Sequence, residues 1–219
     1  MGIQERKERE RERRRQQIMV AAKRVFSSKG FSKTTMEDIA KDAELSPGTL
    51  YLYFKNKDEL YASLSLRILQ YLLIRMEHLI SEKGMNPEQR LEALKQAMYD
   101  VYDFDPLILV NMFHLQSSET LKNLSTELLS EIRELSQKSL DAMAQIFEEG
   151  VREGYLLERS PAVLSTIVWA MFSGIVLWEE SKKIIDGGGD YLKETFDTAF
   201  TIFMRGITKK VDSKSYNAA

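Results

Sequence analysis

Residues 46–57, SPGTLYLYFKNK, bring together side chains suited to hydrogen bonding along a polyanion. Tyr51 and Tyr53 carry phenols that can bond phosphate oxygens, and Lys57 adds a positive charge. Gly48 and Thr49 are small enough to allow close approach to base edges in a DNA groove. The chemistry that these residues suit is recognition of duplex DNA.

Two helix starts position this stretch. Ser46 can cap a helix that opens with a proline, whose missing N–H is not needed there. Asn56 can cap the next helix, with Glu59 at the capping-box position. On the first helix, Leu50 and Phe54 are spaced i, i+4 and must both point inward.

The remaining residues of the first helix then face outward. At about 100° per residue, the two tyrosines fall roughly 80° to either side of the buried line. A phosphate at the start of the next helix would also meet free backbone N–H groups. The residues expected to contact bases are Ser46, Pro47, Gly48, Thr49 and Leu52, and those expected to contact phosphate are Tyr51, Tyr53 and Lys57. Leu52 could contact a thymine methyl or simply pack on Tyr51.

The preceding residues predict the rest of a helix-turn-helix. The periodicity predicts a helix over 17–29 that ends at Gly30. Thr34 with Glu37 predicts a capping box for a second helix, which ends near Ala43. A helix, a tight turn and a helix form the arrangement in which the second helix reads DNA. The alternative is an ordinary helical hairpin.

Residues 17–62 resemble the DNA-binding region of the TetR (tetracycline-repressor) family of bacterial regulators. The resemblance rests on the run FSKTTMEDIAKDAELSPG and on Gly48, Leu50, Tyr51, Tyr53, Phe54, Lys57 and Leu60. It implies a phosphate contact at Thr35 and a helix from Lys57 that links the DNA-reading head to the body. Met36 departs from the family, where a small hydroxyl residue is frequent.

Composition limits the alternatives. A chain of 219 residues forms one or two domains, and with no cysteine it has neither disulfides nor thiolate chemistry. No apolar segment follows the charges at residues 5–15, so we expect no signal peptide and a cytoplasmic location. Residues 1–60 contain 14 Lys and Arg against 10 Asp and Glu, whereas the rest contains 17 against 23. A basic head and an acidic body indicate that the head meets the polyanion.

Residues 5–17 are charged and lack an apolar stripe. Pairs such as Glu5 with Arg9 and Glu10 with Arg14, spaced i, i+4, favour a solvated helical extension. The alternative is that nearby arginines reach a phosphate or a minor groove, the candidates being Arg13, Arg14 and Arg15.

The body reads as helical throughout, so the predicted fold is all-α. The predicted domains are a charged arm (1–16), a helix-turn-helix domain (17–62), a helical effector-binding and dimerisation domain (63–210) and a disordered tail (211–219). Residues 160–178 carry no charge and are apolar on every side. A membrane span is one explanation, but serine, threonine and glycine dilute the segment, so no membrane partner is expected.

The preferred explanation for residues 160–178 is that one side packs on the chain's own core and the other on a second copy. The resemblance implies a homodimer built from the last two helices. The candidate interface residues are Val168, Ile175, Phe196, Phe200 and Phe203, and the alternative is that they are simply core.

Neither a catalytic nor a metal-binding set is recognisable. His78 and His114 belong to no ligand motif, so no enzyme activity, metal or cofactor is expected. Methionine and aromatic residues of the body could instead line an apolar cavity, an inference that depends mainly on the resemblance. The candidates are Met98, Tyr102, Met112, Phe113, His114, Gln116, Phe147, Trp169 and Phe172, and each could equally be core.

Together these features predict a homodimer that binds a palindromic operator, with reading helices roughly 34–36 Å apart, and that a small lipophilic effector releases. The resemblance implies repression. Two alternatives stay open. One is a DNA-binding or architectural module without an effector, and the other is a helical adaptor that binds protein.

Overall fold

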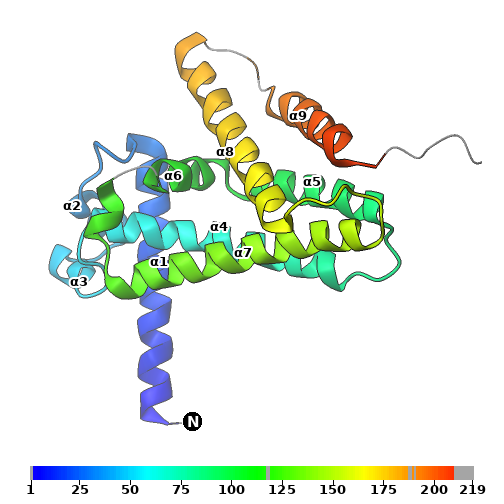
Figure 1. The fold of residues 1–219 in the computed structure, drawn as a ribbon. Coiled ribbons are helices and arrows are strands. Elements are labelled where there is room, and N and C mark those ends of the chain that lie inside the picture. The colour runs from blue at the N-terminus through cyan, green and yellow to red at the C-terminus, as the bar shows by residue number, and fades with distance from the viewer. Residues whose placement is uncertain (1, 117–118, 187–188, 190, 210–219) are drawn as a thin grey trace, which may run out of the picture. The chain divides into compact units, whose positions relative to one another are not determined.

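The computed structural model describes residues 2–116, 119–186, 189 and 191–209 (Figure 1). Over these residues the regular elements are all helical, with one isolated antiparallel bridge between Leu156 and Thr208, which confirms the all-α prediction. The predicted tail at 211–219 lies outside the described residues.

The helices follow one another with short connections. Their bounds are α1 Ile3–Lys29, α2 Met36–Asp42, α3 Pro47–Tyr51, α4 Lys57–Ser81, α5 Pro87–Phe104, α6 Pro106–Gln116, η1 (a 3₁₀ helix) Glu119–Asn123, α7 Thr126–Arg152, α8 Pro161–Asp186 and α9 Leu192–Ile207.

The chain forms two compact units, each built from two segments. Unit 1 comprises Met1–Ile68 and Leu107–Arg133, and unit 2 comprises Leu69–Pro106 and Glu134–Ala219. The predicted domains were continuous in sequence, whereas these units interleave. As a result, α4 and α7 each contribute residues to both units.

The core of unit 1 holds the first four helices together. Ile18 of α1, Ile39 of α2 and Leu50 of α3 are each 0% exposed. Phe31, in the turn after α1, folds back onto this core, where its ring centroid lies 4.5 Å from that of Tyr61 in α4. This packing joins the turn after α1 to α4.

The core of unit 2 is rich in aromatic rings. Phe172 of α8 and Phe196 of α9 have ring centroids 5.2 Å apart, and Tyr99 of α5 meets Phe196 edge-on at 5.5 Å. Arg90 of α5 donates hydrogen bonds to the carbonyls of Leu79 and Ile80 near the end of α4 and to that of Glu82, just after it, at 3.1 Å. These contacts hold α5, α8 and α9 together as one bundle.

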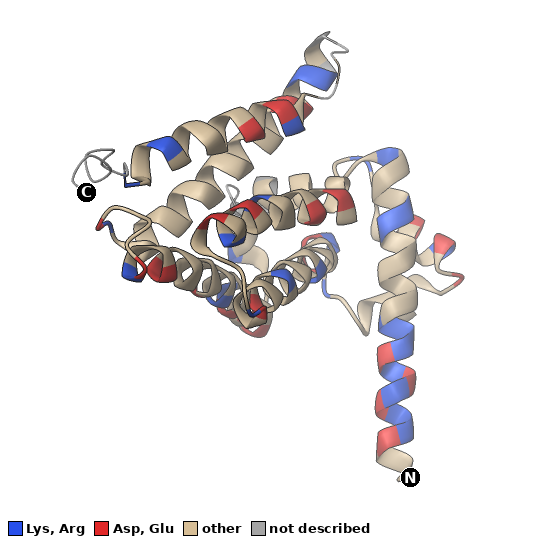
Figure 2. Ribbon diagram, turned by 90° about the vertical axis from the view of Figure 1, so that its right-hand side faces the viewer, with Lys and Arg blue, Asp and Glu red and all other residues tan. Residues whose placement is uncertain are grey.

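Two local predictions need correction. The first helix begins at Ile3 and not near residue 17, because the expected helical extension at residues 5–17 is continuous with it in α1 (Figure 2). The capping residue of α2 is Thr35 with Asp38, one residue later than the predicted pair of Thr34 and Glu37. The Thr34 hydroxyl instead donates to the Gly30 carbonyl at 2.8 Å and closes the turn after α1.

Candidate nucleic-acid interface

Helix α3 is short and is fixed by its inner face. The Ser46 Oγ accepts a hydrogen bond from the Thr49 N–H at 3.1 Å and caps the helix, as predicted. Leu50 and Phe54 are 0% and 1% exposed, which confirms that both point inward. The helix ends at Tyr51, but the Phe54 N–H still donates to the Leu50 carbonyl at 3.2 Å and keeps the i, i+4 relation.

The outer face of α3 is open and small. Leu52 is 76% exposed, which argues against the alternative that it simply packs on Tyr51. A Cβ added to Gly48 would meet only the Ser46 Oγ, at 3.9 Å. The Ser46 Oγ and the Thr49 Oγ1 lie 2.8 Å apart, so the two hydroxyls pair with each other. All the predicted base-contacting residues therefore lie at the surface, although Thr49 is half-buried.

The two tyrosines lie at the end of this face. Tyr51 is 48% exposed, and Tyr53, just beyond the helix, is half-buried. Within the described part of the chain, neither phenol hydroxyl has a hydrogen-bond partner. Both hydroxyls are thus available to a ligand oxygen such as that of a phosphate.

Thr35 lies at the exposed N-terminus of α2. Its Oγ1 accepts the Asp38 N–H at 3.1 Å, and the Asp38 carboxylate accepts the Thr35 N–H at the same distance. Lys29, at 2.5 Å, together with the Thr35 N–H, holds the pKa of Asp38 below its ordinary value. A phosphate at this helix end would meet the other free N–H groups of the first turn.

Lys57 has a role that the sequence did not predict. Its Nζ donates to the carbonyls of Phe31 at 2.8 Å and Thr34 at 3.0 Å, and it lies 4.4 Å from the centre of the Phe31 ring. Two of its three donors are therefore committed to the turn between α1 and α2. The Asn56 side chain accepts the Glu59 N–H at 2.7 Å, so the α4 cap is as predicted. Lys57 therefore also fixes this turn, and its contact with a phosphate stays a prediction.

The reading segment itself carries no charge. Between Glu44 and Lys55 the sequence contains no acidic or basic residue. Two cations on α1 are paired, since Arg24 lies 2.7 Å from Asp42 and Lys29 is bound to Asp38. Attraction to a polyanion must therefore come from residues outside α3.

Basic residues of α1 lie next to α3, and of these only Arg14 was predicted, as an alternative, to contact DNA. We call residues 3–16 the arm. Lys7, Glu10, Arg11 and Arg14 of the arm line an open hollow of about 440 Å³ with Leu52 and Tyr53. The signal in the sequence was the spacing of the basic residues along one helix, which a search for apolar stripes passes over.

The residues predicted to line an effector cavity fall in both units. Met112 and Phe113 belong to unit 1, and the others that the structure describes belong to unit 2. The buried side chains among them are Met98, Tyr102, Met112, Phe113, Phe147 and Phe172, whereas Trp169 is half-buried. The side chains of His114 and Gln116 lie outside the described ones. The cavity therefore stays a prediction.

Three of the five residues predicted for the dimer interface need correction. Val168, Phe196 and Phe200 are at most 3% exposed and so lie inside the chain's own core. Ile175 and Phe203 are half-buried. The exposed apolar residues of α8 lie on its other side, and those of large size are Val163, Ile167, Trp178 and Ile185. The sequence could not separate these faces because both are apolar.

Two family models match the chain over much of its length. The model described as bacterial regulatory proteins, tetR family, matches residues 18–64. A second, described as the C-terminal region of QacR-like proteins, matches residues 90–209.

Curated relatives are regulators. The fatty acid metabolism regulator protein of Bacillus subtilis (strain 168) is 30% identical over 142 residues, which cover 65% of this chain and 70% of the relative. The HTH-type transcriptional repressor KstR2 of Mycobacterium tuberculosis (strain ATCC 25618 / H37Rv) is 24% identical over 197 residues, which cover 90% of this chain and 94% of the relative.

Solved structures share the fold. The TetR family transcriptional regulator PfmR from Thermus thermophilus has a TM-score of 0.68 at 22% identity, over 86% of this chain and 97% of that one. The transcriptional regulator FadR from Bacillus subtilis, in complex with stearoyl-CoA, has a TM-score of 0.65 at 23% identity, over 88% of this chain and 98% of that one.

Proposed function

The chain belongs to the TetR family of bacterial regulatory proteins, and from that premise we propose that it is a homodimeric repressor that binds palindromic operator DNA and is released by a lipophilic effector. The observation that carries the DNA-binding part is the outer face of α3, where Gly48 and the exposed Leu52 leave an open, uncharged surface. We place this protein in the cytoplasm, where its operator would be.

In this proposal α3 lies in the major groove. Ser46, Thr49 and Leu52 contact base edges, and Gly48 lets the helix approach closely. The Tyr51 and Tyr53 hydroxyls and the N-terminus of α2 at Thr35 bind phosphates on the groove walls. Lys57 stabilises the helix-turn-helix by donating hydrogen bonds to the carbonyls of Phe31 and Thr34 in the turn between α1 and α2.

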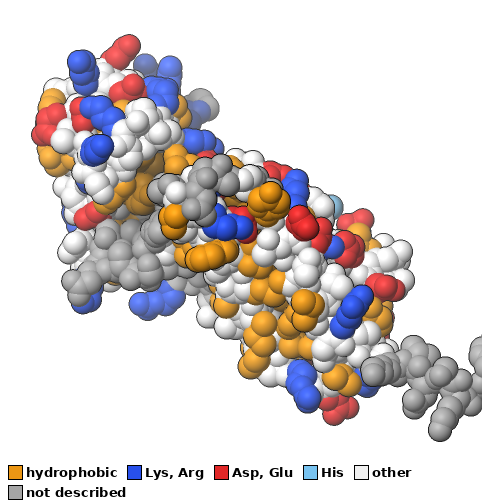
Figure 3. All heavy atoms as spheres, turned by 90° about the horizontal axis from the view of Figure 1, so that it is seen from above, with side chains coloured by type: hydrophobic (Ala, Val, Ile, Leu, Met, Phe, Trp, Pro, Cys, Tyr) orange, Lys and Arg blue, Asp and Glu red, His pale blue; other side chains and the backbone are white. Residues whose placement is uncertain are grey.

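The proposed homodimer uses the outer face of α8. Val163, Ile167 and Trp178 are 55%, 42% and 62% exposed and lie on one side of the helix, because they are spaced i, i+4 and i+15. Between them a Cβ added to Gly174 would meet nothing within 4 Å, so a second helix could approach closely. Figure 3, which looks down on the α8–α9 pair of Figure 1, shows hydrophobic side chains on the surface.

This apolar face also bears on the membrane alternative. Pro161–Lys183 is long and apolar enough to cross a bilayer, with a mean hydropathy of 1.7, and 28% of that window is buried within the chain. A partner helix of the same composition would cover the exposed remainder, as in other obligate homodimers. The dimer thus accounts for the composition of α8 without a membrane.

The lipophilic effector is supported by the relatives and by the composition of unit 2. One similar structure contains stearoyl-CoA, and one relative is named for fatty acid metabolism. Because α4 and α7 each have residues in both units, a ligand that shifts either helix in unit 2 can move its continuation in unit 1. Such a ligand acts only as far as it binds the two arrangements with different affinity.

Selection of bound sequences from random duplex DNA tests the proposal. We expect a palindromic motif, and stearoyl-CoA added to the selected duplex should lower its affinity in a fluorescence anisotropy titration. A motif without a ligand effect would favour a DNA-binding protein that has no acyl effector. Absence of salt-dependent duplex binding would contradict the regulator and favour a protein adaptor.

A further inference from the structure

Apart from Ile3 at its tip, the arm has no apolar side chain with which to pack on protein or lipid. After Ile3, residues 4–17 contain no apolar residue, and the side chains of residues 3–13 are all exposed. A helix of this length is marginal in isolation, so its continuity with the buried half of α1 maintains it. What the arm can bind is therefore decided by its charges.

The charges of the arm are segregated around the helix. It contains seven basic and four acidic residues, a net charge of +3 out of the +4 carried by residues 1–60. Three of the acidic residues form one stripe, and Arg6, Arg9 and Arg13 form a parallel stripe about 100° further around the helix. The other four basic residues, Lys7, Arg11, Arg14 and Arg15, lie on the opposite flank of the acidic stripe. Positive charge therefore covers the rest of the helix surface, where Glu10 is the one carboxylate.

These arginines are not neutralised by the neighbouring glutamates. In the part of the chain that the structure describes, no ion pair joins an arm arginine to a carboxylate. The predicted pairs are replaced by other bonds. Arg9 donates to the Glu5 backbone carbonyl at 3.3 Å, and Arg14 donates to the Gln17 side chain at 3.1 Å.

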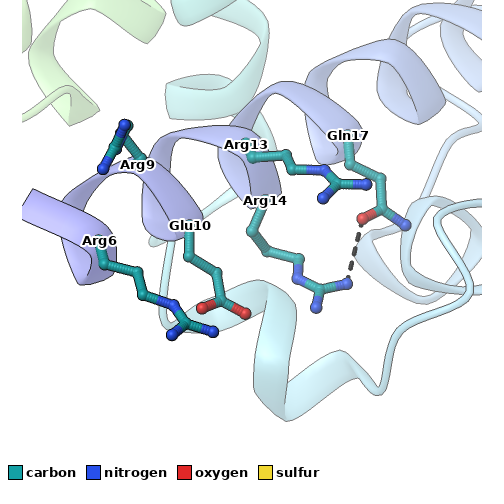
Figure 4. Close-up of a pocket in the computed structure, with 6 residues that line it drawn as sticks. All are labelled: Arg6, Arg9, Glu10, Arg13, Arg14 and Gln17. Atoms are coloured by element: carbon teal, nitrogen blue, oxygen red, sulfur yellow. Dashed lines mark hydrogen bonds between the residues drawn. The ribbon is translucent and has the colours of Figure 1, made fainter. Parts of the chain in front are cut away.

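The basic side of the arm leads to the helix-turn-helix. Gln17, at its inner end, donates to the Ala43 carbonyl in the turn between α2 and α3 at 2.9 Å. Arg6, Glu10 and Arg14 project from the same side of α1 as Gln17 (Figure 4). With Arg9 and Arg13 they line an open hollow of about 470 Å³. The adjoining hollow of the arm contains Leu52 and Tyr53 of the reading segment.

Binding to DNA needs cations that the reading segment lacks. Neutralisation of phosphates supplies much of the affinity of most DNA-binding proteins. Here α3 has no charge, Lys57 is bound to two carbonyls, and Arg24 and Lys29 are paired with aspartates. The arginines of the arm are the largest group of cations next to α3 without an ion pair among the described residues.

We propose that the arm is a phosphate-binding helix, which lays Arg6, Arg9 and Arg13 along the DNA backbone that flanks the bases read by α3. This inference rests on the proposed DNA-binding function. At a rise of 1.5 Å per residue the arm is about 21 Å long, which equals the axial rise of roughly six base pairs of DNA. It reads no bases, and its contribution is to affinity and to the length of DNA that is covered.

The test compares the unaltered protein, an arm variant and a control variant. Each protein is titrated against two forms of the duplex selected from random DNA, one with flanks of about six base pairs and one without flanks. The arm variant is R6Q/R9Q/R13Q, and the matched control R152Q/R159Q/R205Q removes the same charge from exposed arginines of unit 2. Glutamine has a helix propensity close to that of arginine, and circular dichroism checks that helicity is unchanged.

We expect three results. The slope of log affinity against log salt should become shallower by about 0.9 for each lost phosphate contact in the arm variant and stay unchanged in the control. Removing the flanks should weaken the unaltered protein but not the arm variant. The motif selected by the arm variant should equal that of the unaltered protein.

Other results would overturn the inference. An arm variant with unaltered slope and affinity, on a duplex that the unaltered protein binds with sequence preference, would refute the arm's role alone. Loss of a base position from the selected motif would show base readout in place of phosphate binding. If the unaltered protein bound no duplex, both this inference and the proposed function would fail.

Discussion

Gly48 is a glycine that the fold of this chain does not require. It lies in α3 without a positive φ, and a Cβ at this position would meet only the Ser46 Oγ at 3.9 Å. An alanine there would favour the helix. The absence of a side chain is explained by what α3 approaches, which we propose is a DNA groove.

Gly48→Ala should therefore separate stability from binding. We expect the free energy of unfolding to stay unchanged or rise by up to about 1 kcal/mol, because alanine has the higher helix propensity. Affinity for the selected duplex should fall about tenfold or more, because the methyl group keeps α3 away from the bases. Denaturant unfolding and anisotropy titration measure the two effects. An alanine variant with full affinity would contradict close approach at this residue.

Tyr51→Phe should weaken binding to all sequences alike. The Tyr51 hydroxyl has no partner among the described residues, so its loss costs the fold little, whereas a bond to a charged phosphate contributes about 1.5–3 kcal/mol. We expect a loss of roughly tenfold or more for both the selected and a scrambled duplex. Thr49→Ala is the matched comparison, since it should relax preference at one base position only. Unchanged affinity of Tyr51→Phe would refute the phosphate contact.

At the scale of elements, the reading helix is held by the turn before α2. Lys57 in α4 reaches back to the carbonyls of Phe31 and Thr34 and lies over the Phe31 ring. The Phe31 ring in turn packs on Tyr61, and burial raises the pKa of the Tyr61 phenol well above its ordinary range. Lys57 thus joins the start of α4 to the turn between α1 and α2.

Lys57→Met should destabilise the protein, since two carbonyls lose a charged donor. The expected loss is about 1–2 kcal/mol, which lowers the melting temperature by roughly 2–8 °C for a chain of this size. Lys55→Met is the control, because Lys55 is exposed and its side chain has no hydrogen bond within the described residues. Thermal unfolding of both variants decides the point. Equal melting temperatures would show that the carbonyl contacts are not needed.

At the scale of the whole molecule, α8 presents two apolar faces. Its inner face packs on α9 through Val168 and Phe172, which are 0% exposed. Its outer face, with Ile167 and Trp178, is left open by the single chain. We propose that this outer face joins two copies, which would present two reading helices to one palindromic site.

Ile167→Glu should therefore separate the proposed dimer into monomers. A carboxylate placed opposite its own symmetry mate would be buried without a partner, which costs several kcal/mol. Ile74→Glu is the control, because Ile74 is an exposed isoleucine of α4, 60% exposed against 42% for Ile167. Light scattering after gel filtration measures the mass. A dimer that survives Ile167→Glu would place the interface elsewhere.

Much of the local structure could be read from the chain alone. The Ser46 and Asn56 caps, the inward Leu50 and Phe54, and the all-helical fold were predicted because caps and helical periodicity depend on residues a few positions apart. The family could be recognised for the same reason, since its motifs lie in one short stretch.

What needed the tertiary structure depends on contacts between distant residues. Lys57 meets carbonyls 23 and 26 residues away, and no local pattern shows that its charge is used there. The predicted interface was placed on Val168 because both faces of α8 are apolar, and only packing against α9 decides which face is core. The sequence left open whether arginines of the arm reach a phosphate, because charge spacing along a helix does not state what lies next to it. Only the fold places Arg11 and Arg14 beside Leu52.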